Sequence, residues 1–193
     1  MDKIIKNKNI RKLLLKYDRK RNNDIVGKIQ TYLKLEDKII DVGAGLCTVA
    51  RKLKKTGYDI SPVDVKNISL FDDIIPVVYD GKNIPFKNDS FDTALLITVL
   101  HHTHDPKEVL LEAKRVARKI IVMEDTYKGS FQKYLTFAMD SLTNLEFINH
   151  PYSHKPDRKW RSLFQEVGLE ILDSQSQNYW KFFTSTTYFL QRT

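Results

Sequence analysis

Short, β-branched apolar segments separated by helical stretches are the feature that most constrains the fold of this chain. Residues 38–42 (KIIDV) stop at a glycine, and residues 91–99 (FDTALLITV) form the most strongly apolar segment. Such runs are typical of strands that are buried on both faces of a sheet. Further segments of this kind cover 58–65, 74–79, 119–123, 169–174 and 184–190.

Helical periodicity fills the intervals between these predicted strands. Residues 46–56 place Val49, Ala50 and Leu53 on one face, and Asp105-Pro106 has the composition of a helix start. Other helices are predicted at 10–17, at 24–33 with Asp24 as N-cap, at 129–147 and at 156–167. This alternation predicts an α/β fold, a Rossmann-like three-layer sandwich. Its sheet is expected to be mostly parallel and seven-stranded, with a C-terminal antiparallel strand pair.

The length of 193 residues fits one domain, 1–193, in which residues 1–36 form basic N-terminal helices and residues 126–156 a lid insertion. The single cysteine, Cys47, excludes an intrachain disulfide and a cysteine-rich zinc site. Together with the missing signal sequence, it predicts a cytoplasmic location. Because nowhere do ~20 apolar residues follow one another, no membrane span is expected.

Basic residues are concentrated near the N-terminus. The net charge is +8, and residues 1–38 hold twelve of the 32 Lys and Arg residues but only five acids. Such an arm can contact nucleic acid, anionic lipid or an acidic substrate. The alternative interpretation is a solvated face of surface helices, which the lack of aromatic residues among the basic residues of 1–16 favours.

Acidic residues follow three consecutive predicted strands. Asp41 precedes the pair Gly43 and Gly45, Asp64 lies at the end of the second strand, and Asp80-Gly81 follows the third. In open α/β sheets ligands bind at the carboxyl ends of the strands, where a carboxylate can accept both hydroxyls of a ribose. Thr48 replaces the last glycine of a dinucleotide fingerprint, and no Gly-Lys-Ser/Thr of a P-loop follows. The acids instead suit a ligand that carries positive charge, a ribose and an adenine.

These segments resemble the class I S-adenosylmethionine-dependent methyltransferases, in particular the type 11 group. The resemblance covers about residues 36–125 and rests on IIDVGAG (39–45), VDV (63–65), YDGKNIPFKNDSFD (79–92) and LITVLHHTHDPKEVLLEAKRV (96–116). It implies S-adenosylmethionine as cofactor and a set of cofactor-binding residues. Asp41, Gly43 and Gly45 would line the methionine part, Asp64 and Val65 the ribose, Asp80 and Gly81 the adenine, and Thr98 the amino acid moiety. The sequence departs from the family at Cys47, where a third glycine is usual, and in a shortened segment after Asp64.

The resemblance also implies an enzyme that transfers a methyl group, for which His102, His101 and Glu124 are the candidate catalytic residues. A histidine near its ordinary pKa is a natural general base for an acceptor that is protonated at neutral pH. We expect no metal, because the histidine spacing lacks a completing ligand. Cys47 lies at a predicted helix start, a position that can lower the pKa of a thiol, but in the cofactor loop and not where a nucleophile would meet an acceptor.

We expect a small-molecule methyl acceptor. One alternative is an RNA-directed methyltransferase that uses the basic arm. Another is a non-catalytic methyltransferase-like partner subunit. The sequence leaves the acceptor, the accepting atom and the oligomeric state open.

Overall fold

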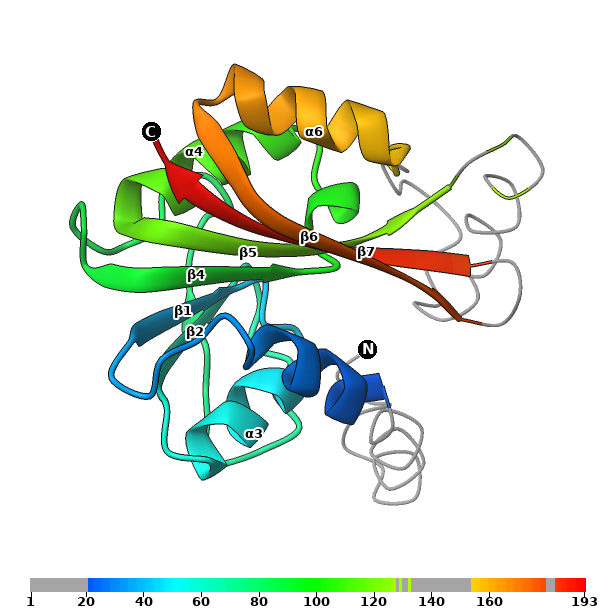
Figure 1. Ribbon diagram of the computed structural model, residues 1–193. Helices are drawn as coiled ribbons and strands as arrows, with labels where there is room; N and C mark the ends of the chain where they lie inside the picture. The colour runs from blue at the N-terminus through cyan, green and yellow to red at the C-terminus, as the bar shows by residue number, and fades with distance from the viewer. Residues whose placement is uncertain (1–20, 128, 130–131, 133–153, 180–182) are drawn as a thin grey trace.

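A computed structural model describes residues 21–127, 129, 132, 154–179 and 183–193 of the chain. Within these residues, seven strands form a single sheet in the order β3-β2-β1-β4-β5-β7-β6 (Figure 1). The strands are β1 (Lys38–Val42), β2 (Asp59–Asp64), β3 (Val77–Val78), β4 (Phe91–Ile97), β5 (Ala117–Thr126), β6 (Leu169–Tyr179) and β7 (Phe183–Arg192). The predicted Rossmann-like α/β sandwich is confirmed.

The sheet is parallel from β3 to β5 and antiparallel beyond it. β1 pairs in parallel with β2 and β4, whereas β7 runs antiparallel to both β5 and β6. The C-terminal antiparallel strand pair is therefore confirmed as well. Because β1 to β5 share one direction, their carboxyl ends lie along one side of the sheet, which we call the carboxyl edge.

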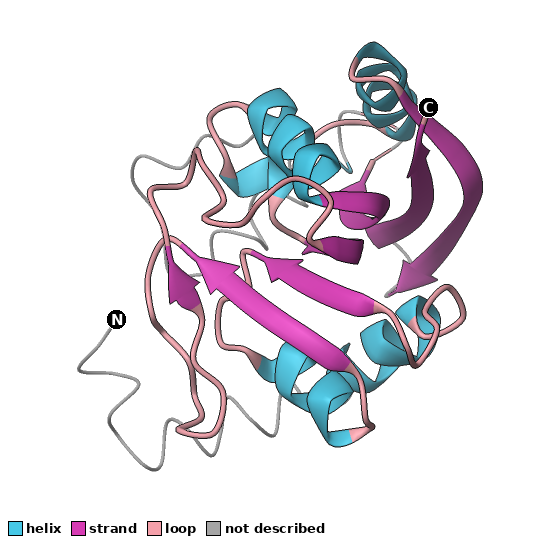
Figure 2. Cartoon of the chain, turned by 90° about the vertical axis from the view of Figure 1, so that its left-hand side faces the viewer, coloured by secondary structure: helices cyan, strands magenta, loops and turns pink. Residues whose placement is uncertain are grey.

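Helices cover both faces of the sheet (Figures 1 and 2). Residues 21–29 and α3 (Thr48–Lys55) lie on one face, and α4 (Pro106–Val116) and α6 (Asp157–Glu166) lie on the other. Each face buries its own apolar cluster, one around Leu53 and one around Trp160, and both side chains are fully buried. No helix among the described residues is long and apolar enough to cross a membrane.

The start of α4 follows from its sequence. The Asp105 carboxylate accepts hydrogen bonds from the backbone N–H groups of Lys107 and Glu108 at 2.9 and 3.4 Å, and Pro106 occupies the first helical position. An N-cap acid followed by proline satisfies or removes the donors that a helix start leaves unpaired. The helix therefore begins where the sequence predicts, just after β4 and the short helix η1 (Leu100–His102).

Other boundaries differ from the expected ones. Asp24 is not an N-cap, because residues 21–23 before it are already helical. The third strand shrinks to Val77–Val78, whereas β5 and β6 extend beyond their predicted ends. Residues 65–76 contain no helix, in agreement with the shortened segment after Asp64. The helices expected at 10–17 and 129–147, and most of the expected lid, lie outside the described residues.

Candidate functional site

The segment between β1 and α3, which we call the glycine loop (residues 43–47), turns the chain sharply at the carboxyl edge. Gly43 and Gly45 have φ angles of 73° and 51°, in the left-handed region that glycine adopts without strain. A Cβ on Gly43 would lie 2.6 Å from a methyl carbon of Val99, whereas a Cβ on Gly45 would meet nothing within 4 Å. Gly43 is thus required by packing, and Gly45 faces open space in which a ligand has room.

Cys47 completes this loop in the conformation that a glycine would take. Its φ is 56°, and it precedes the first residue of α3 without a side-chain capping bond. The side chain is fully buried, and burial is the main cause that raises the pKa of the thiol to about 12. The helix start therefore does not lower the pKa of this thiol, because desolvation of the thiolate outweighs the favourable position.

Asp41 is a buried carboxylate at the next-to-last residue of β1. Its side chain is 3% exposed, and no donor to its carboxylate is found within the described part of the chain. Burial first, and the negative charge of Asp64 second, raise the pKa of Asp41 to about 7. A carboxyl group in this state favours a cation nearby, because a positive charge would stabilise its ionised form.

Asp64 is tied to the glycine loop. Its carboxylate accepts the N–H of Gly45 at 2.7 Å and that of Lys66 at 3.2 Å, one on each oxygen. A carboxylate offers about four lone-pair positions, so about two remain for a ligand. The neighbouring Val65 is exposed.

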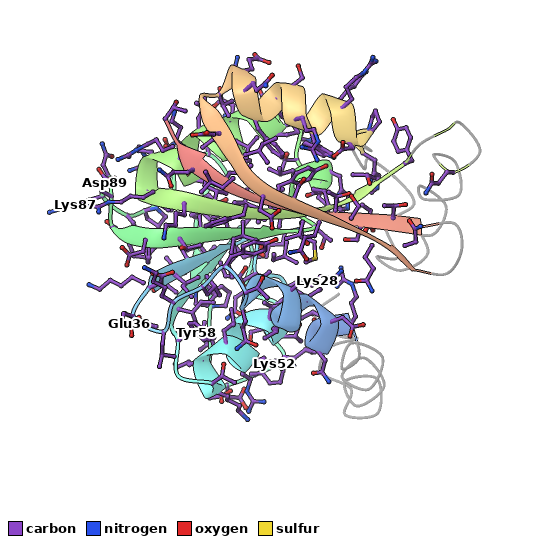
Figure 3. The ribbon with its side chains drawn as sticks, in the orientation of Figure 1. Lys28, Glu36, Lys52, Tyr58, Lys87 and Asp89 are labelled. Atoms are coloured by element: carbon purple, nitrogen blue, oxygen red, sulfur yellow. The ribbon has the colours of Figure 1, made fainter. Side chains whose placement is uncertain are left out.

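Asp80 and Gly81 lie next to Val65. A Cβ on Gly81 would stand 3.0 Å from a methyl carbon of Val65, so the turns after β2 and β3 meet. Asp80 is exposed, and it accepts the N–H groups of Lys82 and Asn83 at 2.8 and 2.7 Å. These bonds, that of Asn83 first, lower the pKa of Asp80. The loop that follows ends at the other end of the sheet, where Lys87 and Asp89 lie (Figure 3).

The turn after β4, residues 98–103, which we call the Thr98 turn, forms the next part of the carboxyl edge. Thr98 has a φ of 54°, which is strained for a β-branched residue. Its N–H donates to the carbonyl of Met123 at 2.7 Å. Its hydroxyl accepts a hydrogen bond from the guanidinium of Arg21 at 3.3 Å. The sequence marked Arg21 only as part of the basic arm, and the structure brings it to the predicted cofactor residue Thr98.

A second basic residue of the same helix approaches the carboxyl edge. Lys28 projects from residues 21–29 (Figure 3) and interacts with the charges of Asp24 and of Asp125, near the end of β5. Partial burial lowers its pKa despite both carboxylates. The helix of residues 21–29 therefore contributes one cation at the end of β4 and one near the end of β5.

His101, His102 and Glu124 come together, but they differ in exposure. The Glu124 side chain is fully buried, and one of its oxygens accepts the N–H groups of Val99 and Leu100 at 3.0 and 2.8 Å. Its other oxygen lies 2.5 Å from Nδ1 of His101, which is 1% exposed. His102 is only half-buried.

His154 joins this group, although the sequence gave it no role in the site. Its ring stacks on His101 with centroids 4.1 Å apart, and the rings of His101 and His102 lie 4.0 Å apart. Some fifty positions separate His154 from the pair, and no periodicity or motif links them. The described residues hold no group of three or more His, Cys, Asp or Glu side chains arranged for a metal ion.

Sequence comparison identifies the domain type. Residues 40–120 match the family model described as "Methyltransferase domain". This match covers less than half of the chain. An uncharacterised protein of Methanocaldococcus jannaschii is 33% identical over 81 residues, which are 42% of this chain and 39% of that protein. The chain thus matches well under two thirds of the length of this relative.

Solved structures share this fold over most of the chain. A protein from Bacillus halodurans, proposed to be a methyltransferase, superposes with a TM-score of 0.70 at 12% identity, over 87% of this chain and 99% of that one. The magnesium protoporphyrin IX methyltransferase of Synechocystis, solved with bound S-adenosylhomocysteine, gives 0.65 at 13% identity, over 91% and 84%.

The side chains at the carboxyl edge fit S-adenosylmethionine, the cofactor that the resemblance in sequence implies. The open face at Gly45 leaves room for the amino acid chain, and the buried charge of Asp41 suits a sulfonium cation. Asp64 has acceptor capacity left for ribose hydroxyls. Each group has chemistry that matches a different part of one ligand.

Proposed function

We propose that this protein transfers a methyl group from S-adenosylmethionine to a small-molecule acceptor. The observation that carries the proposal is the combination at the carboxyl edge of a buried carboxylate at Asp41, a ribose-type acceptor at Asp64 and an open glycine loop. When bound, the cofactor supplies an electrophilic methyl carbon on a positively charged sulfur. Asp41, Asp64 and the glycine loop would hold the cofactor so that this carbon could face a lone pair of the acceptor.

The protein's part in this reaction is mainly to bind and orient. Holding two reactants in line supplies about 7–11 kcal/mol of the barrier. Asp64 and Val65 would hold the ribose, Asp80 and Gly81 the adenine, and Asp41 with the glycine loop the methionine part. The exposed guanidinium of Arg21 beside Thr98 suits the carboxylate of that part.

His102 is the residue that we propose as general base. It is half-buried and follows β4, so its ring can receive a proton from an acceptor hydroxyl or ammonium. His101 and Glu124 are too deeply buried to touch an acceptor. Residues 126–156 are proposed as the lid that excludes water, within a single domain of residues 1–193.

The acceptor class is supported by two observations. No Asn/Asp-Pro-Pro-aromatic sequence follows β4, which disfavours methylation of the exocyclic amines of bases. The structural neighbour from Synechocystis acts on a porphyrin. We place the protein in the cytoplasm, consistent with its single reduced cysteine.

A calorimetric titration with S-adenosylmethionine and S-adenosylhomocysteine tests the proposal. We expect binding of about micromolar strength, roughly −8 kcal/mol. Asp64→Ala should weaken both by at least 100-fold, because the ribose loses its acceptor. Asp59→Ala is the matched control, since Asp59 is an exposed acid at the other end of the same strand. No binding by the wild-type protein would favour the non-catalytic partner subunit, and equal effects of the two variants would show the pocket to be elsewhere.

An RNA acceptor is the second candidate, favoured by the basic residues of 1–38. Binding through such an arm would fall steeply as salt is raised, because phosphate contacts release counterions. Titration with transfer RNA and ribosomal RNA fragments at several salt concentrations distinguishes the two. Absent or salt-insensitive binding would eliminate this candidate.

A further inference from the structure

Three consecutive N–H groups of the Thr98 turn are held by β5. Thr98 donates to the carbonyl of Met123, and Val99 and Leu100 both donate to the same oxygen of Glu124. A buried carboxylate needs such donors, because ionised oxygens without partners are costly away from water. The arrangement therefore satisfies Glu124 and fixes the backbone of the turn at the same time.

The Thr98 turn also constrains the glycine loop. Thr98 is strained at a φ of 54°, and such residues persist only where the surroundings hold them. The side chain of Val99 occupies the space that a Cβ of Gly43 would need, at 2.6 Å. A shift of the turn would move Val99 against or away from the glycine loop, and with it the proposed cofactor site.

The second oxygen of Glu124 pairs with His101, whose ring packs against two other histidine rings. His101 Nδ1 lies 2.5 Å from this oxygen, and His154 and His102 contact the His101 ring with centroids at 4.1 and 4.0 Å. His154 is 5% exposed and directly precedes the segment that leads into α6. The imidazole of His101 is thus packed against two other rings and paired with Glu124, and these contacts restrict its orientation.

We propose that Glu124, His101 and His154 are positioning residues that hold the Thr98 turn against the glycine loop in the geometry that binds the cofactor. The role differs from that of an acid or base acting on the acceptor, because none of the three side chains is more than 5% exposed. The inference rests on the proposed function, since it concerns the same cofactor site.

Substitutions at Glu124 test the role of the carboxylate. We expect Glu124→Ala to weaken S-adenosylhomocysteine binding by 10-fold or more, because Val99 and Leu100 lose their shared acceptor. Glu124→Gln keeps that acceptor and should change the dissociation constant by less than about 3-fold. In the ligand-free protein, amide hydrogen exchange at Val99 and Leu100 should accelerate in the alanine variant only. Unchanged binding and exchange in Glu124→Ala would overturn the proposal.

Two substitutions of His101 separate its hydrogen bond from its ring contacts, and they remain informative if Glu124→Ala does not fold. His101→Asn retains a donor near the position of Nδ1 but loses the ring, whereas His101→Phe retains the ring and loses the donor. We expect His101→Phe to bind S-adenosylhomocysteine more weakly than His101→Asn by at least 3-fold. The reverse order would overturn the role assigned to the hydrogen bond.

His154 is tested through its ring. His154→Ala should weaken S-adenosylhomocysteine binding by about 3-fold, and His154→Phe should restore it because the stacking partner of His101 returns. Equal binding by both variants and the wild-type protein would remove His154 from the group.

A control variant that loses a buried hydrogen bond elsewhere in the protein distinguishes a positioning role from general destabilisation. Tyr188 is fully buried and donates a 2.7 Å hydrogen bond to Asp157, on the face that carries α6. Tyr188→Phe should lower the Tm but leave S-adenosylhomocysteine binding unchanged. If it weakens binding as much as Glu124→Ala, the positioning role is wrong. If the wild-type protein does not bind at all, the proposed function fails instead.

Discussion

Asp41 and Glu124 are both buried acids near the carboxyl ends of parallel strands, β1 and β5, which flank β4, yet their surroundings differ. Glu124 accepts two backbone N–H groups and faces a histidine nitrogen. Asp41 has only burial and the repulsion of Asp64 acting on it, and its pKa is raised to about 7. Hydrogen-bond donors favour a buried carboxylate such as Glu124, whereas burial and the charge of Asp64 disfavour the ionised form of Asp41, a cost that a cationic ligand can offset. The difference separates a residue that shapes the site from one that meets the ligand.

The largest expected effect on this contrast comes from comparing S-adenosylmethionine, which carries a sulfonium charge, with S-adenosylhomocysteine, which lacks it. Asp41→Asn should weaken S-adenosylmethionine binding about 10-fold at pH 8 and change S-adenosylhomocysteine binding by less than about 3-fold. Two opposite unit charges about 12 Å apart attract by roughly 1.4 kcal/mol at an effective dielectric of about 20, which is about tenfold in affinity. Glu124→Gln should affect both ligands equally. Calorimetry measures the dissociation constant of each variant with each of the two ligands. If Asp41→Asn weakened the binding of both ligands equally, the sulfonium would lie away from Asp41.

The pH dependence of stability gives a second test, which needs no ligand. Below pH 7 the folded protein keeps Asp41 protonated, whereas the unfolded chain ionises it above its ordinary pKa of 3.8. The folded state therefore binds more protons, and this contribution to the free energy of unfolding is lost as the pH rises from about 4 to about 7. Asp41→Asn lacks that loss, so its stability relative to wild type should rise by on the order of 2 kcal/mol between pH 5 and pH 8. Urea titrations at pH 5 and pH 8 measure the free energy of unfolding of both proteins. If the difference between variant and wild type were the same at both pH values, it would contradict the raised pKa of Asp41.

The sequence predicted one of these two acids better than the other. Asp41 precedes two glycines after a strand, and that local pattern indicates a ligand loop. The burial of Glu124 and its bonds to Val99 and Leu100 depend on the distance between β4 and β5, which no local pattern encodes. His154 lies far from His101 in sequence, yet the two rings stack. Arg21 reaches Thr98 because its helix packs on the face of the sheet that also carries α3. The mostly parallel sheet with its C-terminal antiparallel strand pair, by contrast, followed from the alternation of strand and helix patterns.

Cys47 offers a third test, because it is the only cysteine in the chain. Its buried thiol has a pKa raised to about 12, so the reactive thiolate is scarce at neutral pH. We expect a thiol reagent to label native protein at least 100-fold more slowly than protein in denaturant. Rapid labelling of the native state would show that the glycine loop opens readily, and S-adenosylhomocysteine should then slow it.

The smallest expected effect concerns a third acid, which lies close to the site but outside it. Asp105 is exposed and caps α4 through the N–H groups of Lys107 and Glu108. Replacing an N-cap acid by alanine costs about 1 kcal/mol, so Asp105→Ala should lower the free energy of unfolding by that amount. Asp105→Asn retains a capping oxygen and should lose less. Neither variant should change S-adenosylhomocysteine binding, since solvent already reaches this carboxylate and it does not hold the Thr98 turn. A loss of binding in Asp105→Ala would mean that the start of α4 shares the positioning role assigned to Glu124.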